Sequence, residues 1–153
     1  MKSRAAVGRR RDRDTWCPMP AAITRLTGVY DADGSIPGEL RYLIGRELGS
    51  RHCALCDITH GRLREKPAWQ AARRRLAVPF RAIHRDERTP AEHAASEGHM
   101  PCVLAHTNAG IEVLLDHDAL ERCAGDPKAL VTAIERALAG SSAVLAEPPA
   151  VAP

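Results

Sequence analysis

The chain has 153 residues, of which 44% are hydrophobic and 27% charged, so it is long enough to bury a core without disulfide staples. Its formal net charge of +3 is concentrated near the start. Residues 1–18 carry six basic and two acidic side chains, a sum of +4, which leaves −1 for the rest of the chain. We therefore expect no basic nucleic-acid-binding face on the body of the protein, and one Phe, two Trp and two Tyr give no platform for stacking bases.

The two ends of the chain differ in composition from its centre. Residues 1–18 are basic and have no apolar stretch of the kind that an export signal carries, and residues 141–153 are rich in Pro and Ala without periodicity. We expect a disordered basic tail at 1–18, one folded domain at 19–140 and a second disordered tail at 141–153, with Met1 or Met19 as the start. No apolar run approaches the length of a membrane span, so we expect a cytoplasmic protein without a membrane partner.

In chain order, the apolar residues predict alternating strands and helices. The predicted strands lie in AITRLTGVYDAD, in VPFRAIHRDE and in PCVLAHTNAGIEVLLD, which reads as two strands joined by TNAG. The predicted helices are IPGELRYLIGREL, KPAWQAARRRL, TPAEHAASEG and GDPKALVTAIERALAG, each with a proline near its start. The order is β-α-(insert)-β-α-β-β-α, which requires parallel strands with crossovers and an antiparallel edge. We therefore expect an α/β fold with a central mixed sheet.

This order, with Pro101 directly before the third strand, resembles the thioredoxin fold. The resemblance covers most of residues 23–139 and rests on the pattern of elements. It implies a cis peptide bond before Pro101 and an active-site turn at the end of the first strand that faces this proline. In this chain the turn contains Asp31 and Asp33, and the piece from Gly49 to Leu76 is an insertion relative to the minimal fold.

The turn itself, VYDADGSIPGEL, allows three interpretations. It resembles the DxDG[ST] turn of a phosphatase superfamily, in which Asp31 would attack phosphorus and Asp33 would be the general acid-base beside Mg²⁺, but the chain lacks the required lysine and second acidic pair. It also resembles the YDGDCxxC turn of a bacterial thiol-disulfide oxidoreductase family, with Gly34 and Pro37 at the cysteine positions, so that no thiolate is available there. The third interpretation is an ordinary turn that starts a helix.

The strongest local signal is HCALCDITHG, which contains Cys53 and Cys56 as a CxxC pair. Together with the YxAD turn, its CxLCxxTxG pattern is similar to a group of uncharacterised bacterial thioredoxin-like proteins that brings no established activity. One hypothesis is a redox or thiol-sensing pair that needs no cofactor and acts on an unknown protein or small-molecule thiol. Cys53, flanked by Arg51 and His52, would attack, and Cys56 would resolve.

Two observations count against this redox hypothesis. A reactive CxxC usually has its first cysteine at a helix N-terminus, whereas this pair follows the C-terminal end of the first predicted helix. That helix runs away from Pro101, so the pair is expected to begin near the opposite end of the sheet unless the insertion folds back.

The alternatives are zinc binding and simple packing. Cys53, Cys56 and His60 supply three ligands of a tetrahedral zinc site, with a fourth to be found elsewhere in the chain. The candidates for the fourth ligand are His52, His84, Cys102 and His106. Cysteine is also a small hydrophobe that packs in interiors, and this is the reading that we favour for Cys102 and Cys123.

Overall fold

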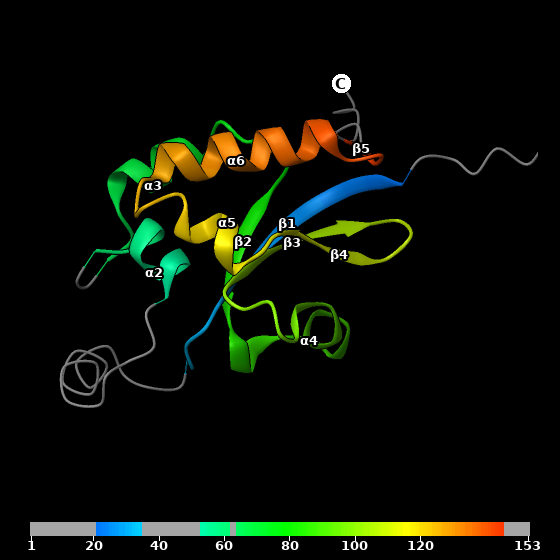
Figure 1. The fold of residues 1–153 in the computed structure, drawn as a ribbon, viewed down its shortest axis with the longest axis horizontal. Helices are drawn as coiled ribbons and strands as arrows, with labels where there is room; N and C mark the ends of the chain where they lie inside the picture. Colours follow the sequence, from blue (N-terminus) through cyan, green and yellow to red (C-terminus); the bar gives the residue numbers. More distant parts are fainter. Residues whose placement is uncertain (1–20, 35–52, 62–63, 146–153) are drawn as a thin grey trace, which may run out of the picture.

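The computed structural model describes residues 21–34, 53–61 and 64–145 (Figure 1). The predicted first helix, IPGELRYLIGREL, and the predicted tail at 1–18 lie outside these residues. The strands are β1 (Ala22–Tyr30), β2 (Phe80–His84), β3 (Cys102–Thr107), β4 (Ile111–Leu115) and β5 (Val144–Leu145). The helices are α2 (Ala54–Thr59), α3 (Pro67–Arg73), the 3₁₀ turn η1 (Arg85–Glu87), α4 (Pro90–Ser96), α5 (His117–Glu121) and α6 (Pro127–Gly140).

The strands form one mixed sheet, so the predicted α/β class is confirmed. Four of them lie in the order β2-β1-β3-β4. β1 is parallel to β2 and antiparallel to β3, and β3 is antiparallel to β4. The short β5 pairs in parallel with the first residues of β1. Since β1 lies between β2 and β3, the residues at its C-terminal end have neighbours on both sides.

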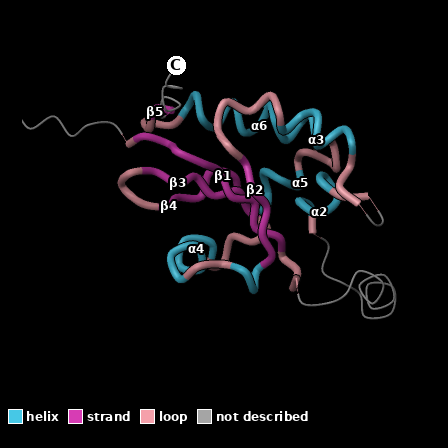
Figure 2. Tube along the Cα trace, turned by 180° about the vertical axis from the view of Figure 1, so that it is seen from behind, coloured by secondary structure: helices cyan, strands magenta, loops and turns pink. Residues whose placement is uncertain are grey.

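Helices cover both faces of the sheet. α2, α3, α5 and α6 lie on one face, and α4 lies on the other (Figures 1 and 2). Alternate side chains of β1 point to the two faces, as a pleated strand requires. Leu26 and Tyr30 belong to the larger apolar cluster, which includes Trp69 and Ile134, whereas Val29 belongs to a smaller cluster on the α4 face.

The start signals that the sequence offers for α4 and α6 are present in the structure. Thr89 Oγ1 accepts a hydrogen bond from the backbone N–H of Glu92, whose carboxylate accepts one from Thr89, which completes a capping box for α4. The Asp126 carboxylate accepts from the N–H of Lys128 at the start of α6. Proline occupies the first turn of α3, α4 and α6, where its missing N–H costs nothing.

Other features agree with the sequence only in part. The peptide bond between Met100 and Pro101 is cis, as the resemblance implies. The helix α2 was not predicted, because its segment has no clear period. The fold also continues past residue 140, the boundary that composition suggests, since Ala143 is buried and β5 pairs with β1.

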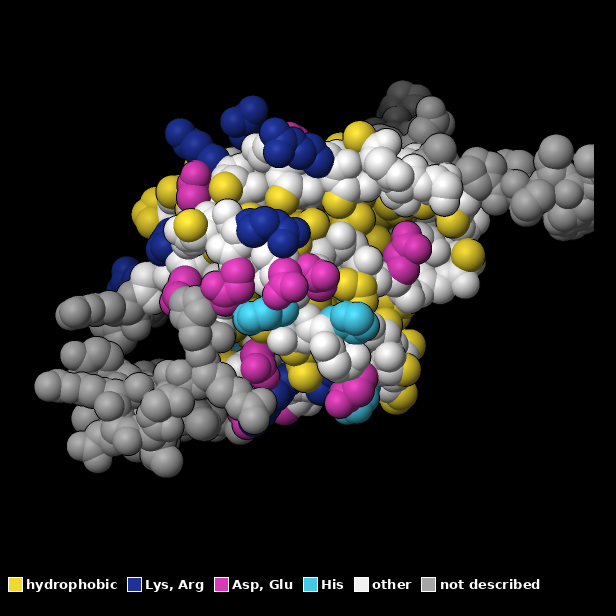
Figure 3. All heavy atoms as spheres, in the orientation of Figure 1, with side chains coloured by type: hydrophobic (Ala, Val, Ile, Leu, Met, Phe, Trp, Pro, Cys, Tyr) yellow, Lys and Arg dark blue, Asp and Glu magenta, His cyan; other side chains and the backbone are white. Residues whose placement is uncertain are grey.

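The surface seen in Figure 3 carries charges of both signs. Basic side chains lie over α3 and α6, and acidic side chains form a band below them, so no continuous basic patch covers this face. Within the described residues, no helix is both long enough and apolar enough to cross a membrane.

Candidate functional site

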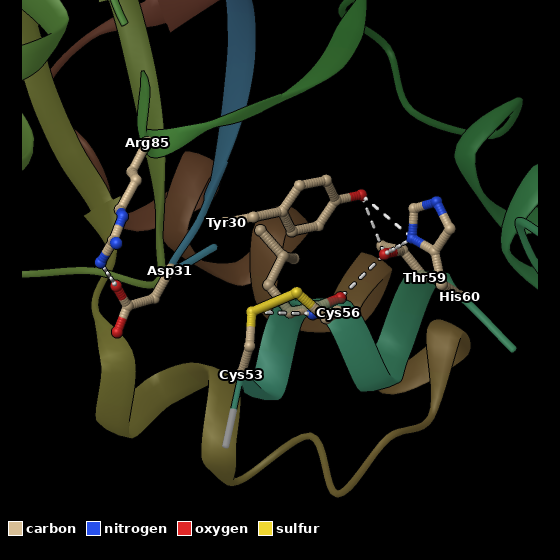
Figure 4. Close-up of a disulfide and its surroundings, with 8 residues drawn as sticks. Tyr30, Asp31, Cys53, Cys56, Thr59, His60 and Arg85 are labelled. Atoms are coloured by element: carbon tan, nitrogen blue, oxygen red, sulfur yellow. Dashed lines mark hydrogen bonds and ion pairs between the residues drawn. A yellow bond between two sulfur atoms is a disulfide. The ribbon is translucent and has the colours of Figure 1, made fainter. Parts of the chain in front are cut away.

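The CxxC pair lies at the start of α2, and its two sulfur atoms are joined as a disulfide (Figure 4). Cys53 is the N-cap residue of this helix, in an extended conformation, and Cys56 is in the first turn. The Cα atoms of the pair are 5.2 Å apart, within the range for disulfides. The backbone N–H of Cys56 donates a hydrogen bond of 3.3 Å to Cys53 Sγ. Cys53 therefore stands at a helix N-terminus, contrary to the expectation, whereas the predicted first helix that precedes the pair lies outside the described residues.

The place of the pair relative to the sheet also differs from the prediction. Tyr30, the last residue of β1, is hydrogen-bonded to Thr59 of α2. At the same end of the sheet Val29 pairs with Cys102, the residue that follows Pro101. α2 therefore lies at the Pro101 end of β1, and the prediction that the pair begins near the opposite end is wrong.

Packing explains why the insertion folds back. Leu55 and Ile58 of α2 are completely buried in the larger apolar cluster. Leu55 lies over Gly28 of β1, where an added Cβ would be 3.1 Å from Leu55 Cδ2 and 2.8 Å from Phe80 Cζ. A glycine at this position lets the helix approach the strand closely. The burial of these two side chains thus fixes α2 against the sheet.

A polar network fixes the other end of α2. The Tyr30 hydroxyl and Thr59 Oγ1 are 2.9 Å apart, and Thr59 Oγ1 is 2.8 Å from both the Leu55 carbonyl oxygen and His60 Nδ1. Because the single hydroxyl proton of Thr59 goes to the Leu55 carbonyl, Tyr30 donates to Thr59. The Tyr30 ring lies 5.5 Å from the His60 ring and 5.4 Å from the His84 ring.

This network joins the two sequence motifs that were noted separately. Tyr30 is the tyrosine of the YxAD turn, and Thr59 is the threonine of CxLCxxTxG. Nothing in their spacing predicts that they pair, and both were noted only as parts of the same resemblance. Both side chains are buried, with exposed fractions of 4% for Tyr30 and 0% for Thr59, so their hydrogen bond is shielded from water.

The two cysteines of the pair differ in exposure and in bonding. Cys53 is 8% exposed, whereas Cys56 is only partly buried. The sulfur of Cys53 accepts the capping hydrogen bond. A backbone N–H that points at a sulfur stabilises negative charge on it, so Cys53 is the sulfur that better accepts the electron pair when the disulfide opens. The helix has only six residues, so we ascribe this effect to the single N–H and not to the helix dipole.

The two aspartates of the turn bind an arginine that the sequence did not single out. Arg85, which follows β2, donates from Nε and Nη2 to the two carboxylate oxygens of Asp33, at 2.5 and 2.6 Å. Asp31 Oδ1 is 3.7 Å from Arg85 Nη1. The hydrogen bonds and charge of Asp33, with a smaller contribution from Asp31, raise the pKa of Arg85 further above its ordinary value. Both carboxylates thus tie the end of β1 to the end of β2.

This arrangement does not support phosphatase chemistry at the turn. The carboxylate of Asp33 is held by a guanidinium in a bidentate pair, and Asp31 faces the same cation. Lys66, one of the two lysines that follow the turn in sequence, donates instead to the backbone carbonyls of Asp57 and Gly125. The Asp31–Asp33 turn therefore has a visible structural role.

Among the described residues, those proposed for zinc are not gathered around one point, and the candidate ligand His52 lies outside these residues. Across residues 21–34, 53–61 and 64–145, no group of three or more His, Cys, Asp or Glu side chains is placed to hold a metal ion. His60 Nδ1 faces Thr59 and Tyr30, and His84 Nδ1 is 2.9 Å from Glu87. Cys102 belongs to the cluster on the α4 face, away from the CxxC pair.

Cys102 and Cys123 are buried, in agreement with the packing interpretation. Cys102 is completely buried, and burial raises the pKa of its thiol to about 12. Cys123 is 4% exposed, and burial also raises its pKa. Thiols with such pKa values are largely protonated near neutral pH and are poor nucleophiles. Of the four cysteines in the described residues, only Cys53 and Cys56 are therefore arranged for thiol chemistry.

Comparison with known proteins adds no relative to this picture. No protein-family model, no curated protein and no solved structure matches the chain.

Proposed function

We propose that the protein is a thioredoxin-like thiol protein whose Cys53–Cys56 pair exchanges electrons with the thiols of a partner. The observation that carries this proposal is the disulfide in the first turn of α2, with the Cys56 N–H directed at Cys53 Sγ. The thioredoxin-like topology is part of the proposal. It is supported by the strand order β2-β1-β3-β4, by the strand directions and by the cis proline that precedes β3.

The size of the loop favours exchange over stapling. A disulfide stabilises a fold mainly by restricting the unfolded chain, and the restriction grows with the loop that it closes. For the four-residue loop from Cys53 to Cys56 this amounts to about 2 kcal/mol, against about 4.7 kcal/mol for a loop of 100 residues. The fold around α2 is held in addition by Leu55, Ile58 and the Tyr30–Thr59 hydrogen bond. The pair can therefore open without the loss of the surrounding core.

The proposal includes a cytoplasmic location and a partner that is a protein or a small thiol. In the cytoplasm thiols are kept reduced, and a disulfide there is usually catalytic or redox-sensing. Exchange proceeds through a mixed disulfide and needs no cofactor. No contact of the described residues favours the zinc alternative, with Cys53, Cys56 and His60 as ligands. Zinc binding is therefore not proposed here, and it remains one of the outcomes that the test distinguishes.

The test combines metal analysis with thiol counting. The full chain is purified under anaerobic conditions, bound metal is measured, and free thiols are titrated before and after mild oxidation. We expect metal-free protein that loses two thiols on oxidation and regains them with a dithiol reductant, with Cys53 and Cys56 identified by peptide mapping. Stoichiometric zinc with protected thiols would contradict the redox proposal. Metal-free protein in which these cysteines do not pair would leave only the packing interpretation.

A further inference from the structure

We infer that Cys56, not Cys53, is the cysteine that forms the mixed disulfide with the partner. The attacking and resolving roles of the two cysteines are then the reverse of those suggested by their order in the sequence. This inference rests on the proposed function. It assigns different roles to two cysteines that the proposal treats as a unit. It is carried by two independent observations, the unequal burial of the two residues and the hydrogen bond between them.

Access separates the two sulfurs. A thiolate attacks a disulfide along the sulfur–sulfur axis, so the attacked sulfur must be reachable from the side opposite its partner. Cys53 is 8% exposed and belongs to the buried core cluster with Leu55 and Ile58. Cys56 lies at the margin of that cluster and is only partly buried. An incoming thiolate therefore reaches Cys56 more readily.

The hydrogen bond separates them a second time. The sulfur that leaves must carry the electron pair of the broken bond, and a sulfur that stabilises negative charge leaves faster. Cys53 Sγ already accepts the N–H of Cys56 at 3.3 Å in the disulfide form, so the donor is in place before the charge develops. Cys53 is thus the better leaving group.

The two observations define one balanced reaction. One thiolate of a partner dithiol attacks Cys56 Sγ, a partner–Cys56 bond forms, and the electron pair of the Cys53–Cys56 bond moves to Cys53 as a thiolate. The second thiolate of the partner then attacks the partner sulfur that is bonded to Cys56, which forms the partner's internal disulfide and releases Cys56 as a thiolate. Two electrons pass from the dithiol to the pair, and the two protons of the partner thiols go to solvent or to the released thiolates. In the reverse direction Cys56 attacks a partner disulfide and Cys53 resolves the mixed disulfide.

Single-cysteine variants test this assignment. Both variants carry Cys17→Ser to remove the cysteine of the N-terminal segment, and Cys53→Ser is compared with Cys56→Ser. Serine keeps an N-cap oxygen at position 53, so α2 retains its cap. The probe is 5,5′-dithiobis(2-nitrobenzoate), and the released thionitrobenzoate gives the rate. We expect the Cys53→Ser variant, which presents Cys56, to react on the order of tenfold faster than the Cys56→Ser variant, because access and not thiolate fraction limits Cys53.

A second measurement avoids substitution at the pair. Oxidised protein that carries only Cys17→Ser is treated with limiting glutathione, quenched in acid and digested, and the glutathione is located by mass spectrometry. We expect it on Cys56. Glutathione on Cys53, or a faster Cys56→Ser variant, would overturn the inference and leave the proposed function intact. If neither variant reacts and the oxidised pair is inert to glutathione and to a dithiol, the proposed function itself fails.

Discussion

The face of the sheet beneath α2, α3, α5 and α6 is closed by apolar side chains, whereas the face beneath α4 encloses a carboxylate. On the α4 face Glu92 is completely buried, and its Oε1 is 3.0 Å from Arg81 Nη2 and 3.4 Å from His106 Nε2. Its Oε2 accepts hydrogen bonds from the backbone and hydroxyl of Thr89. His106 is also 2.9 Å from Thr27 Oγ1. Both faces carry apolar clusters, and the α4 face in addition holds a buried carboxylate whose hydrogen bonds are satisfied.

Because of this difference, we expect the redox state and the pH to affect different faces of the sheet. The disulfide lies on the face of the larger apolar cluster, where Leu55 holds α2 by packing and Tyr30 holds it by the hydrogen bond to Thr59. The groups whose protonation changes the charge of the interior lie on the other face. Oxidation and reduction should therefore act on the α2 face, and acid should act on the α4 face.

The largest effect is expected from the substitution Leu55→Ala. Leu55 is completely buried between α2 and β1, so the change removes transfer free energy and leaves a cavity. We expect a loss of about 3 to 4 kcal/mol in the free energy of unfolding, measured by urea denaturation. Leu145, which is 42% exposed, provides the control: Leu145→Ala should change stability by less than about 0.5 kcal/mol. Equal losses in the two variants would contradict the packing of α2 on the sheet.

The substitution Glu92→Ala tests the α4 face of the sheet. It leaves the donors of Thr89 and Arg81 without their acceptor, and we expect a loss of about 3 kcal/mol. Glu97, at the end of the same helix, is the matched control: its side chain is 65% exposed, and Glu97→Ala should cost less than about 0.5 kcal/mol. A Glu92→Ala protein as stable as the control would show that the carboxylate is not needed to hold α4.

Reduction of the disulfide should have a smaller effect than either of these substitutions. Opening the four-residue loop from Cys53 to Cys56 is expected to lower the free energy of unfolding by about 2 kcal/mol. The measurement is urea denaturation with and without a dithiol reductant. A variant with serine at both positions should be insensitive to the reductant. A reduced protein that unfolds without denaturant would show that the disulfide is a structural staple.

The hydrogen bond between Tyr30 and Thr59 should contribute about 1 kcal/mol. A double-mutant cycle with Tyr30→Phe and Thr59→Val isolates it, since each change removes a hydroxyl and little volume. We expect a coupling energy of about 1 kcal/mol, whereas additive losses would mean that the two hydroxyls do not interact.

The smallest effect is expected from the titration of His106. In the folded protein, burial and the positive charges of Arg25 and Arg81 lower the pKa of His106. The negative charge of Glu92 opposes this shift but does not reverse it. The unfolded chain binds the proton near its ordinary pKa of about 6.5, so stability is full above that pH and falls as the pH drops below it. The slope of unfolding free energy against pH should flatten in His106→Gln. The control His99→Gln should keep the slope, since His99 is exposed; an unchanged slope in His106→Gln would assign the sensitivity to other groups.

Glu92 adds a second range, at lower pH, in which the stability of the fold depends on pH. Burial works to raise its pKa, but the hydrogen bonds from Thr89 and Arg81 outweigh it, and the net direction is down. Its contribution to stability is therefore complete above the ordinary pKa of about 4.5 and is lost as the pH falls from there toward the lower folded pKa.

Much of the fold could be predicted from local signals, and the site could be predicted only in part. The strand that ends at Tyr30 and the capped start of α4 follow from periodicity and from side chains near in sequence. The helix α2 is too short for a period, and a cysteine is an unusual N-cap, so the segment CALCDIT gave no helix signal. Its place depends on Leu55 over Gly28, and the partner of Asp33 is Arg85, 52 residues away. Such contacts join residues that are far apart in the chain, and the spacing of residues in a single sequence does not predict them.

The central claim is that the Cys53–Cys56 pair is a reversible two-electron couple. The full chain is equilibrated in buffers with different ratios of reduced and oxidised dithiothreitol or glutathione, quenched with an alkylating reagent and analysed by peptide mass spectrometry. We predict one reversible transition in which Cys53 and Cys56 are protected or alkylated together, with the same midpoint from either direction, while Cys102 and Cys123 remain unmodified in the folded protein. A pair that stays reduced across the series, or that opens only when the protein unfolds, would contradict this account.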